Sequence, residues 1–136
     1  ATARVPAHEV AKTVVVKLDG KMAMAVLPAA NEVDFELLKK VSNATKASLA
    51  SELEFAHIFP ECELGAIPPI GELYGLDMYV AAALTEDETI FFNAGSHTEL
   101  IQMAYEDFQK STRPKVAKFS RRRRPKKEFQ APEPSA

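Results

Sequence analysis

Residues 12–27 read KTVVVKLDGKMAMAVL, and this stretch decides the fold. Residues 12–18 are rich in β-branched side chains, which favours a β-strand. The dipeptide Asp19-Gly20 follows, and it is typical of a two-residue hairpin turn. Residues 21–27 return as a second strand, and Pro28 ends that strand. The sequence therefore predicts an antiparallel β-hairpin near the start of the chain.

Helix and strand patterns alternate after the hairpin. Asp34 is placed to cap a helix whose apolar face includes Leu38. Ser51 and Glu54 have the spacing of a capping box at the start of a second helix. Further strands are expected at residues 46–49, 78–80 and 89–92.

A third helix is predicted to begin at Ser96, where Glu99 completes another capping box. Its apolar stripe would consist of Leu100, Ile101, Ala104, Tyr105 and Phe108. Because strands and helices are interleaved but the leading hairpin is antiparallel, the expected fold is α+β. We expect a single domain with a mixed, mostly antiparallel β-sheet flanked by helices.

The composition is that of a single globular domain. The chain has 136 residues, of which 46% are hydrophobic and 26% are charged. It contains no apolar run of about 18 residues, so no transmembrane helix and no membrane partner are expected. The single cysteine, Cys62, excludes an internal disulfide and fits a reducing compartment, so a cytoplasmic location is expected.

Charge is distributed unevenly along the chain. Residues 111–136 hold nine basic and two acidic residues, whereas residues 1–110 hold eight basic and 17 acidic ones. This division predicts an acidic body over residues 1–119 and a basic disordered tail over residues 120–136. The tail either contacts a polyanion or only keeps the protein soluble, and composition leaves both readings open.

Lys12 is the most informative single residue. Side chains alternate along a strand, so Lys12 shares a face with Val14 and Val16, which form the more apolar face. A lysine on an inner face is costly to bury unless it is paired, and such lysines are often functional. The alternative is that Lys12, at the strand end, reaches water with its ammonium group.

The segment 93–97, NAGSH, lies between a predicted strand and a predicted helix. Free backbone N–H groups gather at a helix N-terminus, where a phosphate, a carboxylate or a developing oxyanion would be stabilised. Gly95 would let the backbone approach a ligand, and His97 could donate, accept or transfer a proton. The alternative is an ordinary capped helix with His97 on the surface.

Several other chemistries find no support. One cysteine and three scattered histidines do not have the spacing of zinc ligands, so no metal is expected. No phosphate-binding loop or dinucleotide fingerprint is present, and no cofactor is expected. Residues 61–75 form the longest irregular stretch, and its paired prolines and three glycines suit either a pocket wall or a plain crossover between strands.

Four short segments, in this order, resemble those of one family. They are VAKTVVV at residues 10–16, MAVLP at 24–28, GAIPPIG at 65–71 and FNAGSH at 92–97. Each segment alone is weak, but the order and spacing together are fairly specific. Over about residues 5–119 the chain resembles the YbaK/EbsC family, which also occurs as the editing insertion domain of bacterial prolyl-tRNA synthetases.

The resemblance implies an enzyme that hydrolyses the ester between a wrong amino acid and its tRNA, acting in trans. Lys12 occupies the place of the family's essential lysine, and Gly65 that of a glycine at the mouth of its pocket. Asn93, Gly95, Ser96 and His97 match its substrate-lining turn, where His97 would help to select the amino acid. The implied partners are aminoacyl-tRNA and an aminoacyl-tRNA synthetase. The basic residues expected to bind the tRNA backbone are Arg121, Arg122, Arg123, Arg124, Lys126 and Lys127.

Two departures from the family pattern qualify this expectation. The family has a further helix and strand before the hairpin, so an N-terminal part is expected to be missing. Thr13 follows the lysine where members that clear alanine often carry Asn, so Thr13 is an expected substrate contact without implied alanine specificity. The alternative function is a non-catalytic module that binds a nucleotide or a tRNA end. An assembly protein that uses the acidic face has no motif in its favour.

Overall fold

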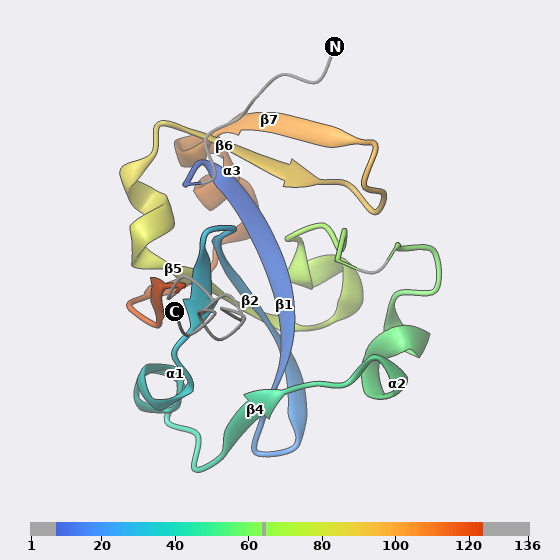
Figure 1. Ribbon diagram of the computed structural model, residues 1–136, viewed down its shortest axis with the longest axis vertical. Coiled ribbons are helices and arrows are strands. Elements are labelled where there is room, and N and C mark those ends of the chain that lie inside the picture. Colours follow the sequence, from blue (N-terminus) through green and yellow to red (C-terminus); the bar gives the residue numbers. More distant parts are fainter. Residues whose placement is uncertain (1–7, 64, 124–136) are drawn as a thin grey trace, which may run out of the picture.

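The structure, a computed structural model, describes residues 8–63 and 65–123. Its centre is a seven-stranded mixed sheet with the order β7-β6-β1-β2-β5-β8 (Figure 1). The seventh strand, β4, pairs with the end of β1 that β6 does not reach. A second sheet consists of β3 and β9. The strands are β1 (Val10–Leu18), β2 (Lys21–Pro28), β3 (Asn31–Val33), β4 (Ala47–Leu49), β5 (Asp77–Ala81), β6 (Thr89–Asn93), β7 (Leu100–Ala104), β8 (Lys115–Ala117) and β9 (Ser120–Arg122).

In the described residues, three α-helices and three short 3₁₀ helices surround the sheet. They are α1 (Phe35–Ser42), α2 (Glu52–Phe55), η1 (Ala56–Ile58), η2 (Gly71–Tyr74), η3 (Ala82–Glu86) and α3 (Tyr105–Thr112). The pairs β1–β2, β1–β4 and β6–β7 are antiparallel, whereas β1–β6, β2–β5 and β5–β8 are parallel. The predicted α+β fold with a mixed sheet is therefore confirmed. In the described ranges no helix is long and apolar enough to cross a membrane.

The predicted hairpin is confirmed as the pair β1 and β2. Asp19 and Gly20 have φ angles of 52° and 83°, as a two-residue turn with left-handed backbone requires. The Asp19 carboxylate also accepts hydrogen bonds from the backbone N–H groups of Thr45 and Lys46. The same aspartate thus shapes the turn and ties it to the segment before β4.

The hairpin separates two hydrophobic clusters because its side chains alternate between the faces of the sheet. Every residue of β2 from Ala23 to Pro28 is buried, so this central strand is apolar on both faces. The first cluster contains Ala11, Val15, Met24, Val26, Phe59, Ile67, Ile90, Phe92 and Phe108 among others. The second contains Val16, Ala23, Ala25, Leu27, Val33, Leu38, Tyr79, Ala81 and Phe119.

The first two predicted helices begin where their caps indicated. The Asp34 carboxylate accepts from the N–H groups of Glu36 and Leu37, each at 3.1 Å, and α1 follows. Ser51 and Glu54 form the reciprocal capping box before α2. The helix α2 lasts only one turn before it tightens into η1, because Pro60 follows closely.

The helix predicted to begin at Ser96 is wrong in its first half. Residues 96–99 form a turn, and Leu100–Ala104 is the strand β7, paired antiparallel with β6. The Ser96 hydroxyl accepts from the N–H of Thr98 at 3.1 Å instead of capping a helix. Only the second half of the stripe is helical, since α3 starts at Tyr105.

The chain is also ordered further than the predicted division at residue 120. Ser120–Arg122 form β9, which pairs antiparallel with β3, and Arg121 lies opposite Glu32. These three residues are therefore part of the body and not of a disordered tail. Arg124, Lys126 and Lys127 lie outside the described residues.

The ion pair between Lys17 and Glu54 makes a prediction about acid stability. The hydrogen bond from the Lys17 ammonium lowers the pKa of Glu54 from 4.5 to about 2. A carboxyl with a lowered folded-state pKa stabilises the fold above its unfolded pKa and loses this effect as pH falls. Between pH 4.5 and 2 the urea midpoint of the native chain should fall more than that of Glu54→Gln. An equal fall in the urea midpoint of the native chain and of Glu54→Gln would contradict this. Glu52→Gln, in the same helical turn, is the control.

Candidate functional site

Lys12 lies on β1 opposite Leu27 of β2, on the same face as Val14 and Val16. The predicted face is therefore the observed one. The side chain is half-buried. Burial lowers the pKa of Lys12 below its usual 10.5, the nearby Arg123 guanidinium lowers it further, and the Glu32 carboxylate opposes both. The ammonium group thus lies where its hydration is incomplete and other charges are near.

One edge of β1 is open beside this lysine. The strand β6 pairs with Val10 and Ala11 only, and β4 pairs with residues from Val16 onward. The Ala50 N–H additionally donates to the Val15 carbonyl at 3.0 Å. Among the described residues, positions 12–14 have no strand partner on this edge. The backbone groups that residues 12–14 present on this edge are therefore not used by a neighbouring strand of the described ranges.

The segment predicted to line the substrate starts at this gap. Phe92 pairs with Ala11, so Asn93 follows on β6 as Lys12 follows on β1. By alternation both side chains leave the face that Ala11 and Phe92 share. The Asn93 amide donates to the carbonyls of Ser96 and Glu99, at 3.3 and 3.5 Å. Asn93 therefore holds the turn closed from its first residue.

The corner at residues 93–97 belongs to the turn between β6 and β7. The predicted anion site at a helix N-terminus is therefore wrong. The helix dipole and the free N–H groups of a first helical turn are absent here, because α3 begins only at Tyr105. Gly95 has a φ of 98°, which favours glycine. Its N–H donates to the Ala66 carbonyl at 2.8 Å. This N–H is therefore already engaged and is a poor donor for an oxyanion.

The corner instead packs on the irregular loop that contains Gly65. The Glu63 N–H donates to the Gly95 carbonyl at 2.8 Å, and the Glu63 carboxylate accepts from the His97 N–H at 3.0 Å. Gly65 has a φ of 78°, and a Cβ there would lie 3.4 Å from Cε1 of His97. The structure thus brings Gly65, Gly95, Ser96 and His97 together as one wall.

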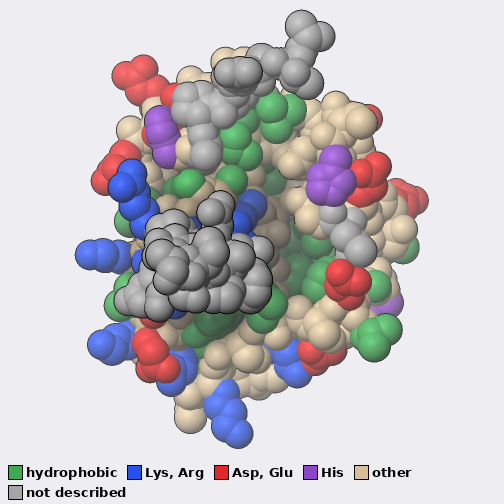
Figure 2. All heavy atoms as spheres, in the orientation of Figure 1, with side chains coloured by type: hydrophobic (Ala, Val, Ile, Leu, Met, Phe, Trp, Pro, Cys, Tyr) green, Lys and Arg blue, Asp and Glu red, His purple; other side chains and the backbone are tan. Residues whose placement is uncertain are grey.

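Among the described residues, no hydrogen bond joins Lys12 or Thr13 to this wall. Thr13 pairs with Val26 and points to the opposite face from Lys12. Figure 2 shows that this face of the molecule is hollowed near its centre, with hydrophobic side chains around the hollow.

Sequence reasoning missed two residues that bear on the site, and it did not place a third one near Lys12. Glu63 accepts a hydrogen bond from the backbone N–H of His97, and the Glu32 carboxylate raises the pKa of Lys12. Arg123 was expected to bind tRNA, but its effect on Lys12 was not predicted. Their roles come from contacts between segments far apart in the chain, which spacing along the sequence does not reveal.

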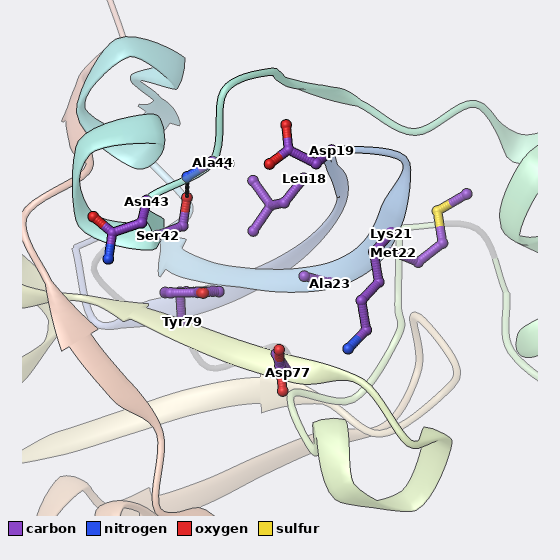
Figure 3. Close-up of a pocket in the computed structure, with 10 residues that line it drawn as sticks. All are labelled: Leu18, Asp19, Lys21, Met22, Ala23, Ser42, Asn43, Ala44, Asp77 and Tyr79. Atoms are coloured by element: carbon purple, nitrogen blue, oxygen red, sulfur yellow. Dashed lines mark hydrogen bonds between the residues drawn. The ribbon is translucent and has the colours of Figure 1, made fainter.

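A separate cavity of about 150 Å³ lies at the turn end of the hairpin (Figure 3). Its lining residues are Leu18, Asp19, Lys21, Met22, Ala23, Ser42, Asn43, Ala44, Asp77 and Tyr79. No predicted site residue is among them. Within the described ranges no group of three His, Cys, Asp or Glu side chains could hold a metal ion.

Comparison with known proteins gives a family and several similar folds. The model of the family described as "Aminoacyl-tRNA editing domain" matches residues 1–111. The hypothetical protein APE2540 superposes with a TM-score of 0.76 at 19% identity, covering 86% of this chain and 77% of that one. A provisionally assigned trans-editing enzyme for prolyl-tRNA synthetase gives 0.76 at 16% identity, covering 85% and 73%. At such identities the superpositions establish the fold.

Proposed function

The chain belongs to the aminoacyl-tRNA editing domain family, and we propose that it is a deacylase that removes a wrongly attached amino acid from tRNA. The observation that carries this proposal is the place of Lys12, half-buried beside the open edge of β1 and next to the start of the Asn93 corner. A cation there can meet a polyanionic RNA end, while the gap beside it admits the acyl group.

The reaction requires little from the protein. Water attacks the ester carbonyl, the tetrahedral intermediate collapses, and the ribose hydroxyl leaves with a proton that came from the water. The protein has to position the water, stabilise the oxyanion and hold the terminal adenosine. No protein nucleophile is needed, which agrees with the lack of a catalytic triad motif. We assign to Lys12 the binding of the terminal phosphate or ribose and the neutralisation of developing charge.

The wall formed by Gly65, Gly95, Ser96 and His97 would then receive the amino acid side chain. A Cβ at residue 65 would lie 3.4 Å from Cε1 of His97, so glycine keeps the space beside the His97 ring free of a further side chain. A pocket of this kind selects by excluding larger side chains. Thr13 points to the other face of β1, so its contact with substrate would pass through the backbone.

The proposed partners follow from the substrate. The domain would act on aminoacyl-tRNA in the cytoplasm and would work alongside the synthetase that makes the error. One protein of similar fold is provisionally assigned to trans-editing for prolyl-tRNA synthetase, which supports a tRNA of that kind as the first to be tested.

A panel of mischarged tRNAs tests the proposal. The full chain is incubated with each tRNA, and the released amino acid is measured against spontaneous hydrolysis in buffer. We expect turnover of a small set of tRNAs that carry compact amino acids. Binding of these tRNAs without any turnover would reject the deacylase and would support the alternative, a non-catalytic module that binds a tRNA end.

A further inference from the structure

The C-terminal strand β9 brings an arginine next to the Lys12 site. The Arg123 N–H donates to the Ala30 carbonyl at 3.2 Å, and the Ala29 N–H donates to the Val10 carbonyl at 2.7 Å. The turn between β2 and β3 is therefore bonded on one side to the start of β1 and on the other to the end of β9. Leu27, which pairs with Lys12, lies three residues before Ala30, so the backbone of Arg123 lies near the Lys12 end of the hairpin. The Arg123 charge also lowers the pKa of Lys12.

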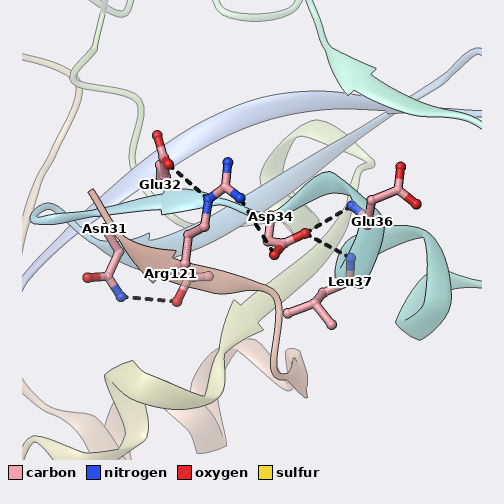
Figure 4. Close-up of polar contacts among 7 residues, drawn as sticks. Asn31, Glu32, Asp34, Glu36, Leu37 and Arg121 are labelled. Atoms are coloured by element: carbon pink, nitrogen blue, oxygen red, sulfur yellow. Dashed lines mark hydrogen bonds and ion pairs between the residues drawn. The ribbon is translucent and has the colours of Figure 1, made fainter. Parts of the chain in front are cut away.

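Arg121 fixes this strand in place (Figure 4). Its Nε donates to Oε1 of Glu32 at 2.9 Å, and its Nη1 lies 4.0 Å from Oδ2 of Asp34. The Asp34 N–H donates to the Phe119 carbonyl at 2.7 Å, and the Asn31 amide donates to the Ser120 hydroxyl at 3.1 Å. We call this set of contacts the Arg121 clamp. It spans 89 residues of sequence between Glu32 and Arg121.

Over the described ranges, the cations around the clamp outnumber the carboxylates that face them. Glu32 is the carboxylate that attracts Lys12, but it already accepts a hydrogen bond from Arg121. Asp34 faces the same arginine and also caps α1. In the described part of the chain no ion pair joins Lys12 or Arg123 to a carboxylate. Two neighbouring cations, one of them partly desolvated, are thus left to attract an anion.

We propose that Lys12 and Arg123 form a cation pair that binds one phosphodiester group at the 3′ end of an RNA, and that the Arg121 clamp holds the strand that carries Arg123. This assignment rests on the proposed function for the identity of the ligand. It divides the basic residues that were all expected to bind tRNA: Arg121 is structural, and Arg123 contacts RNA. The C-terminal members of the clamp, residues 119–121, and Arg123 lie outside residues 1–111, the part that matches the family.

Binding of an RNA stem-loop that ends in CCA and carries no amino acid tests the cation pair. Affinity is measured by fluorescence anisotropy at several salt concentrations for the native chain, Arg123→Gln and the control Lys21→Gln. Lys21 is an exposed cation at the turn end of the same hairpin, opposite Leu18. We expect Arg123→Gln to bind roughly 5- to 10-fold more weakly at about 0.1 M salt, with a salt slope smaller by about one. Lys21→Gln should stay within about twofold of the native affinity.

Neutral phosphates identify the group that is bound. Each of the last three phosphodiesters is replaced in turn by a methylphosphonate, which carries no charge. On one of these three RNAs, Arg123→Gln should bind as tightly as the native chain does. On the other two, Arg123→Gln should bind more weakly than the native chain by the full factor given above. An unchanged affinity in Arg123→Gln, or the same loss on all three neutral hairpins, would overturn the proposal.

These measurements use uncharged RNA and therefore do not depend on turnover. If the native chain hydrolyses no mischarged tRNA, the proposed function fails, while the hairpin titrations still decide whether the cation pair exists. If turnover is present and Arg123→Gln binds like the native chain, only the cation pair is rejected.

Discussion

Replacing Lys12 with alanine should reduce kcat/KM for tRNA deacylation by at least about 100-fold, the size of effect seen when one charge-stabilising group is removed. The lysine is half-buried beside the unpaired edge of β1, where the proposed function places the reacting ester. Its removal would take away both roles proposed for it, the contact with the RNA end and the neutralisation of the oxyanion. The readout is release of amino acid from a mischarged tRNA that the native chain hydrolyses.

The stability of the variant separates a role in the reaction from a role in folding. Lys12 lies at the rim of the second cluster and carries a desolvation cost, so its loss should move the thermal midpoint by no more than about 2 °C. Lys21→Ala, on the same hairpin but at its turn end, should keep full activity. Full activity in Lys12→Ala would reject the role assigned to the lysine, and a collapse of its thermal midpoint would assign it to folding.

The pH dependence gives a second check on Lys12. Burial lowers its pKa below 10.5, so the ammonium group loses its proton at a lower pH than an exposed lysine does. Binding of the RNA stem-loop without an amino acid to the native chain should therefore weaken as pH rises towards the lowered pKa of Lys12. Lys12→Ala should lack this weakening.

Local signals predicted the elements that depend on neighbours in the sequence. The Asp19-Gly20 turn, the Asp34 cap and the Ser51–Glu54 capping box all occur as expected because each is satisfied within a few residues. The same kind of motif failed at Ser96. The Ser96 hydroxyl accepts from the Thr98 N–H, and Leu100–Ala104 pairs with β6 as a strand.

The candidate site divides in the same way. Strand alternation placed Lys12 on its correct face, since that face depends only on the residues beside it. The strand β9 was missed because a run of arginines resembles a solvated tail, and its partner β3 lies about 90 residues earlier. Glu63 and Arg123 acquire their roles only through such distant contacts.

Phe119 tests whether the C-terminal segment belongs to the folded unit. Its side chain has no exposed surface, and it packs in the second cluster with residues such as Leu27 and Leu38. Replacing a buried phenylalanine with alanine removes apolar contacts and leaves a cavity, so Phe119→Ala should lower the free energy of unfolding by about 3–5 kcal/mol. Urea denaturation followed by circular dichroism measures this loss.

Val116→Ala is the matched control, because Val116 is in the adjacent strand β8 but is 42% exposed. It should cost only about 0.5 kcal/mol or less. A similarly small cost for Phe119→Ala would show that residues 115–123 are not anchored to the sheet. The Arg121 clamp would then have no fixed base, because the Phe119 carbonyl is the acceptor that joins β9 to Asp34. A large cost would show that the segment before Arg123 is anchored in the core, which is what a shared phosphate site with Lys12 requires.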